Sequence, residues 1–165
     1  MKVSILLILI AGALIFSGCP PKQVPEEKIP KEFKVIDEGA QSGYRGDLSF
    51  EIITDQTDFA RAIGTMSVSK DLSSVDFNTQ FVILALRGRK STGGYSIEIQ
   101  DVKREENGLW VTVKVGSPAK DAMVSQAFTS FYQMVVVEKG DLTGDSIIVF
   151  ATPEGKVLVT EEVSL

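Results

Sequence analysis

The chain has 165 residues and a formal net charge of −5, with no histidine and a single cysteine. This length favours one domain, and the negative balance argues against a nucleic-acid partner, because phosphate backbones are bound by clustered lysine and arginine. The missing histidine, and the absence of cysteine beyond Cys19, remove serine–histidine and cysteine–histidine catalysis and the usual zinc sites, so we expect a protein without enzymatic activity, metal or cofactor.

The first segment has the layout of an export signal. A positive start precedes an apolar run from Val3 to Phe16, which is shorter than a membrane-spanning helix requires, and two small residues precede Cys19. This layout resembles a bacterial lipoprotein signal, in which cleavage precedes a cysteine that then carries acyl chains. We predict a signal peptide over residues 1–18 and a lipid anchor on Cys19, facing the extracytoplasmic side of the cell envelope. An uncleaved N-terminal anchor is the alternative.

Residues 19–33 have the composition of a tether. Four of the six prolines fall here, mixed with charged residues. Proline fixes φ and removes a backbone donor, which favours an extended, semi-rigid chain of roughly 40 Å. We therefore predict a single domain over residues 34–165, held clear of the lipid surface.

Within the domain, the spacing of apolar residues is typical of strands, then of a helix, and then of strands again. Residues 34–39 predict an edge strand, and residues 48–53 alternate as a second strand. Helical spacing of apolar residues then predicts one short helix near residues 56–66. Residues 81–87 are continuously apolar, which predicts a central strand that is buried on both faces.

In the second half of the domain, the pattern of apolar residues predicts strands alone. Residues 95–102 and 109–115 alternate on either side of a turn at 105–108, which predicts a hairpin that buries Ile97, Ile99, Val111 and Val113. Further strands are predicted at 131–139, 145–152 and 156–163. About seven strands and one helix indicate an α+β domain of mainly antiparallel β structure, either a rolled sheet or a sandwich.

The order of these strands brings several loops to one end. In a hairpin, the start of the first strand and the end of the second lie at the same end of the sheet. If strand 131–139 pairs antiparallel beside the hairpin, its first residues join them, and so does the exit of strand 81–87. We therefore expect three loops to converge, at residues 87–95, 116–120 and 126–132.

Three stretches carry a family resemblance. They read VDFNTQFVILALRGRKSTGGYSIEI, then GSP, then QAFTSFYQMVVVEK. Together they resemble the PrcB-type C-terminal domain, named for a lipoprotein subunit of a bacterial cell-surface protease complex. Thr92 to Ser96 is the most specific part, whereas the family often has proline at the positions of Ser91 and Phe131. The resemblance implies a non-catalytic envelope lipoprotein with a protein partner.

The glycine pair in the TGGY stretch has two interpretations. Glycine permits positive φ and close approach of another backbone, so the stretch is either a tight turn before a strand or a loop that contacts a partner. The expected convergence of loops is the reason to consider the second interpretation. It makes the candidate partner-binding residues Thr92, Gly93, Gly94, Tyr95, Ser117, Pro118, Thr129, Ser130 and Tyr132.

The leading functional hypothesis is a membrane-tethered interaction module that binds a protein, for example as a subunit of an envelope protease complex. One alternative is a protease inhibitor that presents the converging loops, because TGGY is similar to the TTGY loop of chagasin-type inhibitors. Another is a module that binds a small ligand or a glycan, which would need a pocket.

Overall fold

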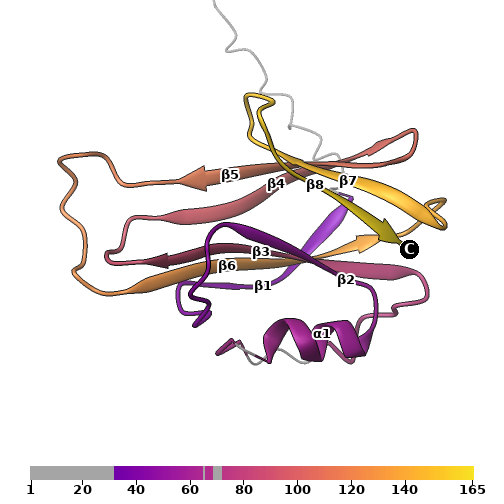
Figure 1. The fold of residues 1–165 in the computed structure, drawn as a ribbon, viewed down its shortest axis with the longest axis horizontal. Coiled ribbons are helices and arrows are strands. Elements are labelled where there is room, and N and C mark those ends of the chain that lie inside the picture. The colour runs from indigo at the N-terminus through magenta and orange to yellow at the C-terminus, as the bar shows by residue number, and fades with distance from the viewer. Residues whose placement is uncertain (1–31, 65, 69–71) are drawn as a thin grey trace, which may run out of the picture.

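The computed structural model describes residues 32–64, 66–68 and 72–165. The predicted signal peptide, Cys19 and nearly all of the predicted tether lie outside the described residues. The described part forms eight strands in two four-stranded sheets and one short helix (Figure 1). The β-rich, mainly antiparallel class is confirmed. Each of the eight strands overlaps one of the predicted ranges, although their total was given as about seven.

The first sheet is entirely antiparallel. Its strands are β1 (Phe33–Gly39), β6 (Thr129–Glu138), β3 (Gln80–Lys90) and β2 (Ser49–Ile53), and they lie side by side in this order. β1 is an edge strand and β3 is central, as the sequence predicts. β3 runs beyond the predicted end at residue 87, because it continues to Lys90 after a break in register.

The second sheet contains the predicted hairpin. Its strands, in spatial order, are β4 (Ser96–Glu105), β5 (Gly108–Gly116), β7 (Asp145–Ala151) and β8 (Val157–Ser164). β4 and β5 pair antiparallel, as do β7 and β8, but β5 and β7 pair parallel.

The prediction that the strand at 131–139 pairs beside the hairpin was wrong. It does not lie beside the hairpin: β6 crosses to the first sheet and inserts between β1 and β3. The physical reason is the apolar run from Met134 to Val137, which is buried on both faces of the strand. Only a central strand of the first sheet, which is covered on both sides, provides such a place.

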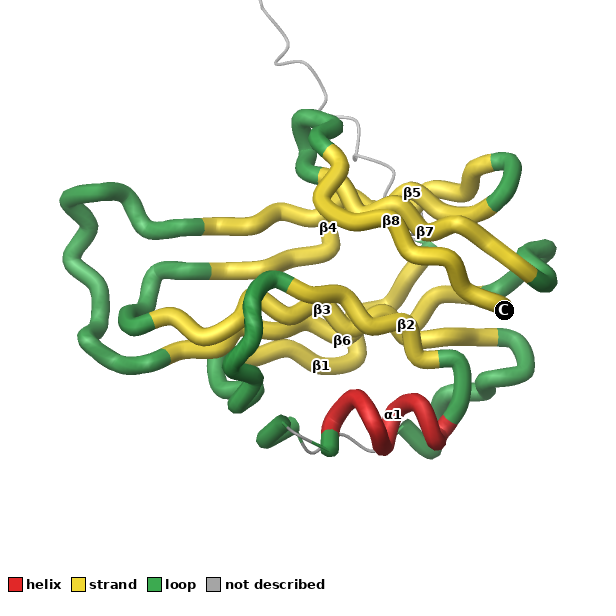
Figure 2. Tube along the Cα trace, in the orientation of Figure 1, coloured by secondary structure: helices red, strands yellow, loops and turns green. Residues whose placement is uncertain are grey.

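The main core fills the space between the two sheets, which form separate layers in Figure 2. The rings of Phe50 on β2 and Phe150 on β7 stack across it, with 4.1 Å between their centroids. The predicted register of the hairpin is confirmed, since the core includes Ile97, Ile99, Val111 and Val113.

A second apolar cluster covers the outer face of the first sheet. The helix α1 (Gln56–Ile63) packs there through Phe59, and the Asp55 side chain caps its first turn by accepting a hydrogen bond from the Asp58 N–H. The helix ends three residues before the predicted limit. β3 is therefore buried on both faces, as predicted: Phe81, Ile83 and Ala85 face the other sheet, and Val82, Leu84 and Leu86 belong to the helix-side cluster.

Candidate partner-binding site

Three loops meet at one end of the sandwich, on the left in Figure 1. They are residues 40–48, 91–95 and 117–128, which follow β1, β3 and β5, and together we call them the loop end. The Gly93 N–H donates to the Ser125 carbonyl at 2.9 Å, and the Thr129 hydroxyl donates to the Thr92 carbonyl at 2.8 Å. The loops after β3 and β5 are thus joined by hydrogen bonds, in the neighbourhood that the sequence predicts.

The loop after β1 was not assigned to this end by the sequence. It is held against the first residues of β6: the Ser42 N–H donates to the Ser130 carbonyl, and the Gly43 N–H donates to the Ser130 hydroxyl, each at 3.0 Å. Its glycine-rich composition indicates a turn, but its location depends on the pairing of β1 with β6, which is far away in sequence.

Gly93 and Gly94 lie at the contact between two loops of the loop end. Gly94 has a φ of 81°, and a Cβ atom placed on it would come within 2.8 Å of the Val124 side chain and 2.9 Å of Pro118. A Cβ atom on Gly93 would meet the Ser125 hydroxyl at 2.5 Å. Both glycines therefore allow the loops after β3 and β5 to pack closely against each other.

The other candidate residues differ in their exposure. Ser117 and Gly94 are exposed, whereas Thr92, Tyr95 and Pro118 are half-buried. Thr129 and Ser130 are buried, with 7% and 5% of their surface exposed, and their hydrogen bonds hold the neighbouring loops. These two residues support the loop end and offer little surface to a partner.

Tyr132 lies apart from the loop end. Its ring packs on the helix-side face of the first sheet, and its hydroxyl donates to the Asp37 carboxylate at 3.0 Å. Burial, together with this hydrogen bond, raises the pKa of Tyr132 to about 12. The structure therefore brings the other eight candidate residues together and leaves Tyr132 outside the group.

Tyr95 is flanked by two cations. The Arg87 guanidinium lies 5.5 Å from the centre of its ring and the Lys90 ammonium 5.8 Å from it. Arg87 also donates to the Ser117 hydroxyl at 3.3 Å, which links β3 to the loop after β5. These contacts fix the TGGY stretch relative to both loops.

A bulge in β3 separates the directions of its two arginines. The register with β6 shifts between Leu86 and Arg89, and Gly88 within the shift has a φ of 79°. As a result, Arg87 lies over Tyr95, while the guanidinium of Arg89 lies 4.0 Å from the ring centre of Phe128. Phe128 is 60% exposed, so this pair lies on the surface.

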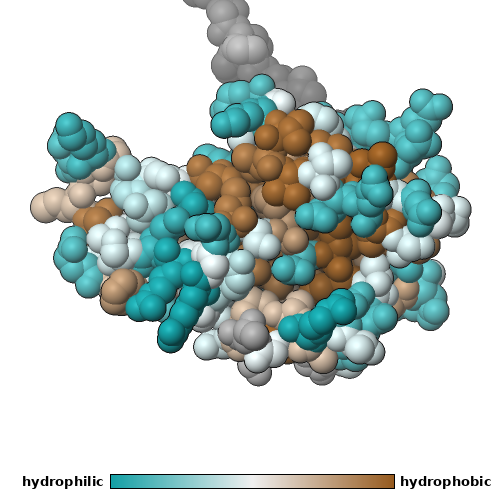
Figure 3. All heavy atoms as spheres, in the orientation of Figure 1, coloured by the Kyte–Doolittle hydropathy of each residue, from teal (hydrophilic) through white to brown (hydrophobic). Residues whose placement is uncertain are grey.

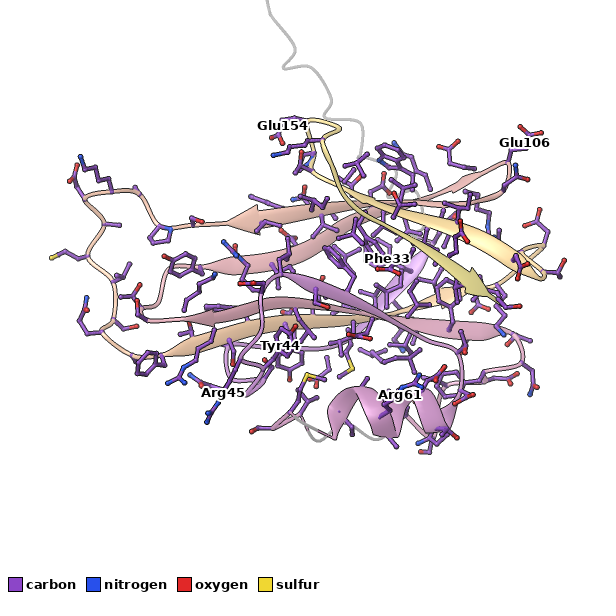
Figure 4. All side chains as sticks on the ribbon, in the orientation of Figure 1. Phe33, Tyr44, Arg45, Arg61, Glu106 and Glu154 are labelled. Carbon is purple, nitrogen blue, oxygen red and sulfur yellow. The ribbon has the colours of Figure 1, made fainter. Side chains whose placement is uncertain are left out.

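The positive charge beside the loop end comes from the end of β3. Within the three loops, Arg45 and Lys120 are balanced by Asp47 and Asp121, whereas Arg87, Arg89 and Lys90 lie at the adjoining end of β3. In the described part of the chain, none of these cations has a carboxylate within 4.0 Å. Figure 4 shows Arg45 on the loop-end side of the domain and Glu106 in the turn at the opposite end.

The loop end is also more polar than the middle of the domain. In Figure 3, hydrophilic side chains dominate it, while hydrophobic ones gather over the neighbouring edges of β2 and β8. Met123 and Phe128 are the large apolar side chains that the loop after β5 exposes. A partner would thus meet charged groups with a few apolar contacts.

Residues 32–64, 66–68 and 72–165 contain no group of three or more acidic, histidine or cysteine side chains that could hold a metal ion. None of their helices is long and apolar enough to span a bilayer.

Comparison with known proteins gives one result. A model of the family described as PrcB C-terminal matches residues 81–138, which extend from β3 to the end of β6. The match confirms the family resemblance over this segment, which contains two of the three loops of the loop end. No curated protein and no solved structure matches the chain.

Proposed function

From the match to the PrcB C-terminal family, we propose that the chain is a non-catalytic protein-interaction module of the bacterial cell envelope. In this proposal, a lipid on Cys19 tethers the domain to a membrane on the extracytoplasmic side. The loop end binds a protein partner, such as a protease of an envelope complex. The observation that carries the proposal is a surface of three interlocked loops beside the end of β3, where the cations have no carboxylate partner among the described residues.

Interlocked loops favour binding because they lose little freedom when a partner arrives. Ordering mobile side chains and loops costs free energy on association, and a preorganised surface avoids much of that cost. At the loop end, hydrogen bonds from Thr129, Gly93 and Ser42 already fix the three loops. The arrangement therefore supports protein recognition through loops on a rigid scaffold.

β1 begins at the end of the domain that is opposite to the loop end. Phe33 pairs with Val137, near the end of β6, whereas Gly39 pairs with Tyr132, near its start. β1 thus runs towards the loop end, and a tether that arrives at Phe33 arrives at the opposite end of the domain. With the chain anchored at Cys19, the loop end would point away from the membrane and towards soluble or neighbouring proteins.

The same geometry supports protease inhibition as a second candidate, because an inhibitor also needs several loops at one end. Binding of a small ligand has less support at the loop end. The pocket there has a volume of about 180 Å³, whereas sites for drug-sized ligands occupy roughly 300–1,000 Å³.

The proposal is tested with the full chain, purified in detergent from its own membranes. We expect the wild type to co-purify with a partner and the Thr92→Glu, Ser117→Glu double variant to lose it while keeping its circular dichroism spectrum, because the new side chains add bulk and negative charge at this end. Asn107→Glu, at the opposite turn, is the control and should keep the partner. Full binding by the double variant would end the proposal. Protease activity of the isolated complex then separates a subunit, which leaves the protease active, from an inhibitor.

A further inference from the structure

A small pocket opens at the loop end between the loop after β1 and the start of β6. Its volume is about 180 Å³, and its lining includes Tyr44, Arg45, Arg89, Phe128 and Ser130. Pockets of this size take one side chain rather than a cofactor.

The walls of the pocket are fixed from several directions. The Gln41 side chain donates to the Phe128 carbonyl at 3.1 Å, and the Gly43 N–H donates to the Ser130 hydroxyl at 3.0 Å. Arg89 rests on the ring of Phe128, with 4.0 Å between its guanidinium carbon and the ring centre. A guanidinium that is held against a ring loses little freedom when its N–H groups bind a ligand.

The charges in the pocket are unbalanced. Arg45 and Arg89 both line it, and no carboxylate of the described residues lies within 4.0 Å of either. A guanidinium presents N–H donors in a planar fork that fits a carboxylate with two parallel hydrogen bonds. The pocket therefore has the size and the donors for one carboxylate group.

We propose that this pocket binds a glutamate or aspartate side chain from an acidic segment of the partner protein. The inference rests on the proposed function and adds the chemistry of the partner. The exposed ring of Phe128 beside Arg89 would contact an apolar neighbour of that acidic residue. An anionic lipid headgroup is the less favoured occupant, because β1 begins at the end of the domain opposite to this pocket.

The test uses a fluorescein-labelled hexaglutamate peptide and the full chain in detergent, with binding followed by fluorescence anisotropy. We expect the wild type to bind hexaglutamate and not hexaglutamine. Arg45→Gln and Arg89→Gln together should weaken binding roughly tenfold or more. Lys103→Gln, at an exposed position of β4 and outside the pocket, removes one charge as a control and should change affinity less than twofold. Arg89→Lys keeps the charge but loses the planar fork, so it should bind more weakly than the wild type.

Three outcomes would overturn the inference. The first is equal hexaglutamate binding by the wild type and the double arginine variant. The second is a lipid result, in which neither protein binds the peptide and only the wild type prefers phosphatidylglycerol vesicles to phosphatidylcholine vesicles. The third comes from the partner purification, which separates this inference from the proposed function. If the double arginine variant keeps the partner while the Thr92→Glu, Ser117→Glu variant loses it, the interaction module stands and the acidic-segment inference falls.

Discussion

The Gln133 side chain accepts a hydrogen bond from the main-chain N–H of Ile99, with 2.7 Å between the two atoms. Gln133 lies on β6 in the first sheet and Ile99 on β4 in the second, so the bond joins the two sheets inside the core. The amide nitrogen of Gln133 also donates to the Glu38 carboxylate at 2.8 Å. Both ends of this buried side chain are therefore satisfied.

Gln133→Leu should destabilise the domain. The leucine would leave the Ile99 N–H without its acceptor in a buried position, which costs about 1–3 kcal/mol. Urea denaturation of the full chain measures the change in free energy of unfolding. Gln126→Leu, in the exposed loop after β5, is the matched control and should stay within about ±0.5 kcal/mol of the wild type. Equal unfolding midpoints for the two variants would contradict the structural role of Gln133.

Gly94→Ala should cost more stability than Gly155→Ala. Both glycines have positive φ, 81° and 84°, so an alanine in this left-handed conformation costs about 1–2 kcal/mol of stability at either position. Only at Gly94 does the new methyl group also meet Val124 and Pro118, since nothing lies within 4 Å of a Cβ atom at Gly155. Thermal unfolding compares the two variants directly. The close packing of the loops is refuted if both lose the same amount.

Tyr132 should make the stability of the domain depend on pH in the alkaline range. Its pKa is raised from 10.0 to about 12 in the folded state by burial and by its hydrogen bond to Asp37. A raised pKa means that the contribution is fully present below pH 10 and is lost between pH 10 and about 12, as the phenol ionises first in the unfolded chain. Urea denaturation across this range should show a shallower decline for Tyr132→Phe than for the wild type. Identical declines would show that Tyr132 ionises equally easily in both states.

Cys19→Ser should abolish lipidation, because the chain has no other thiol. Mass spectrometry of the membrane fraction should show a lipid-bearing chain that begins at Cys19 in the wild type and no such species in the variant. An intact 165-residue chain with an unmodified Cys19 would favour the uncleaved N-terminal anchor.

Local pattern was sufficient to predict the β4–β5 hairpin and the central position of β3. Alternation on either side of a short turn indicates which residues of the hairpin face inward as far as Ile99, where a register shift interrupts it. A continuous apolar run leaves β3 no exposed face. The partners of β6 and β7 could not be predicted in this way. The choice between sheets depends on which faces are covered, and α1 covers the outer face of the first sheet only after the chain has folded.

The same distinction holds for the candidate site. The convergence of the loops after β3 and β5 follows from strand direction, which the sequence indicates. The direction of Arg89 depends on the bulge at Gly88, since one extra residue shifts the alternation of everything beyond it. Tyr132 was grouped with the loop at 126–132 although it also falls in the strand predicted at 131–139. It is the fourth residue of β6, which begins at Thr129, and its ring lies on the helix-side face.

The path of the chain between the sheets has a consequence for proteolysis. Residues before the loop at 117–128 supply β1, β2 and β3 to one sheet and β4 and β5 to the other, while residues after it supply β6 to the first and β7 and β8 to the second. A protease that cleaved this exposed loop would produce two fragments that are still paired with each other. β6 would remain hydrogen-bonded between β1 and β3, and β7 would remain hydrogen-bonded to β5. We expect a domain built in this way to hold together after a cut in this exposed loop, which would suit the proposed role beside a protease.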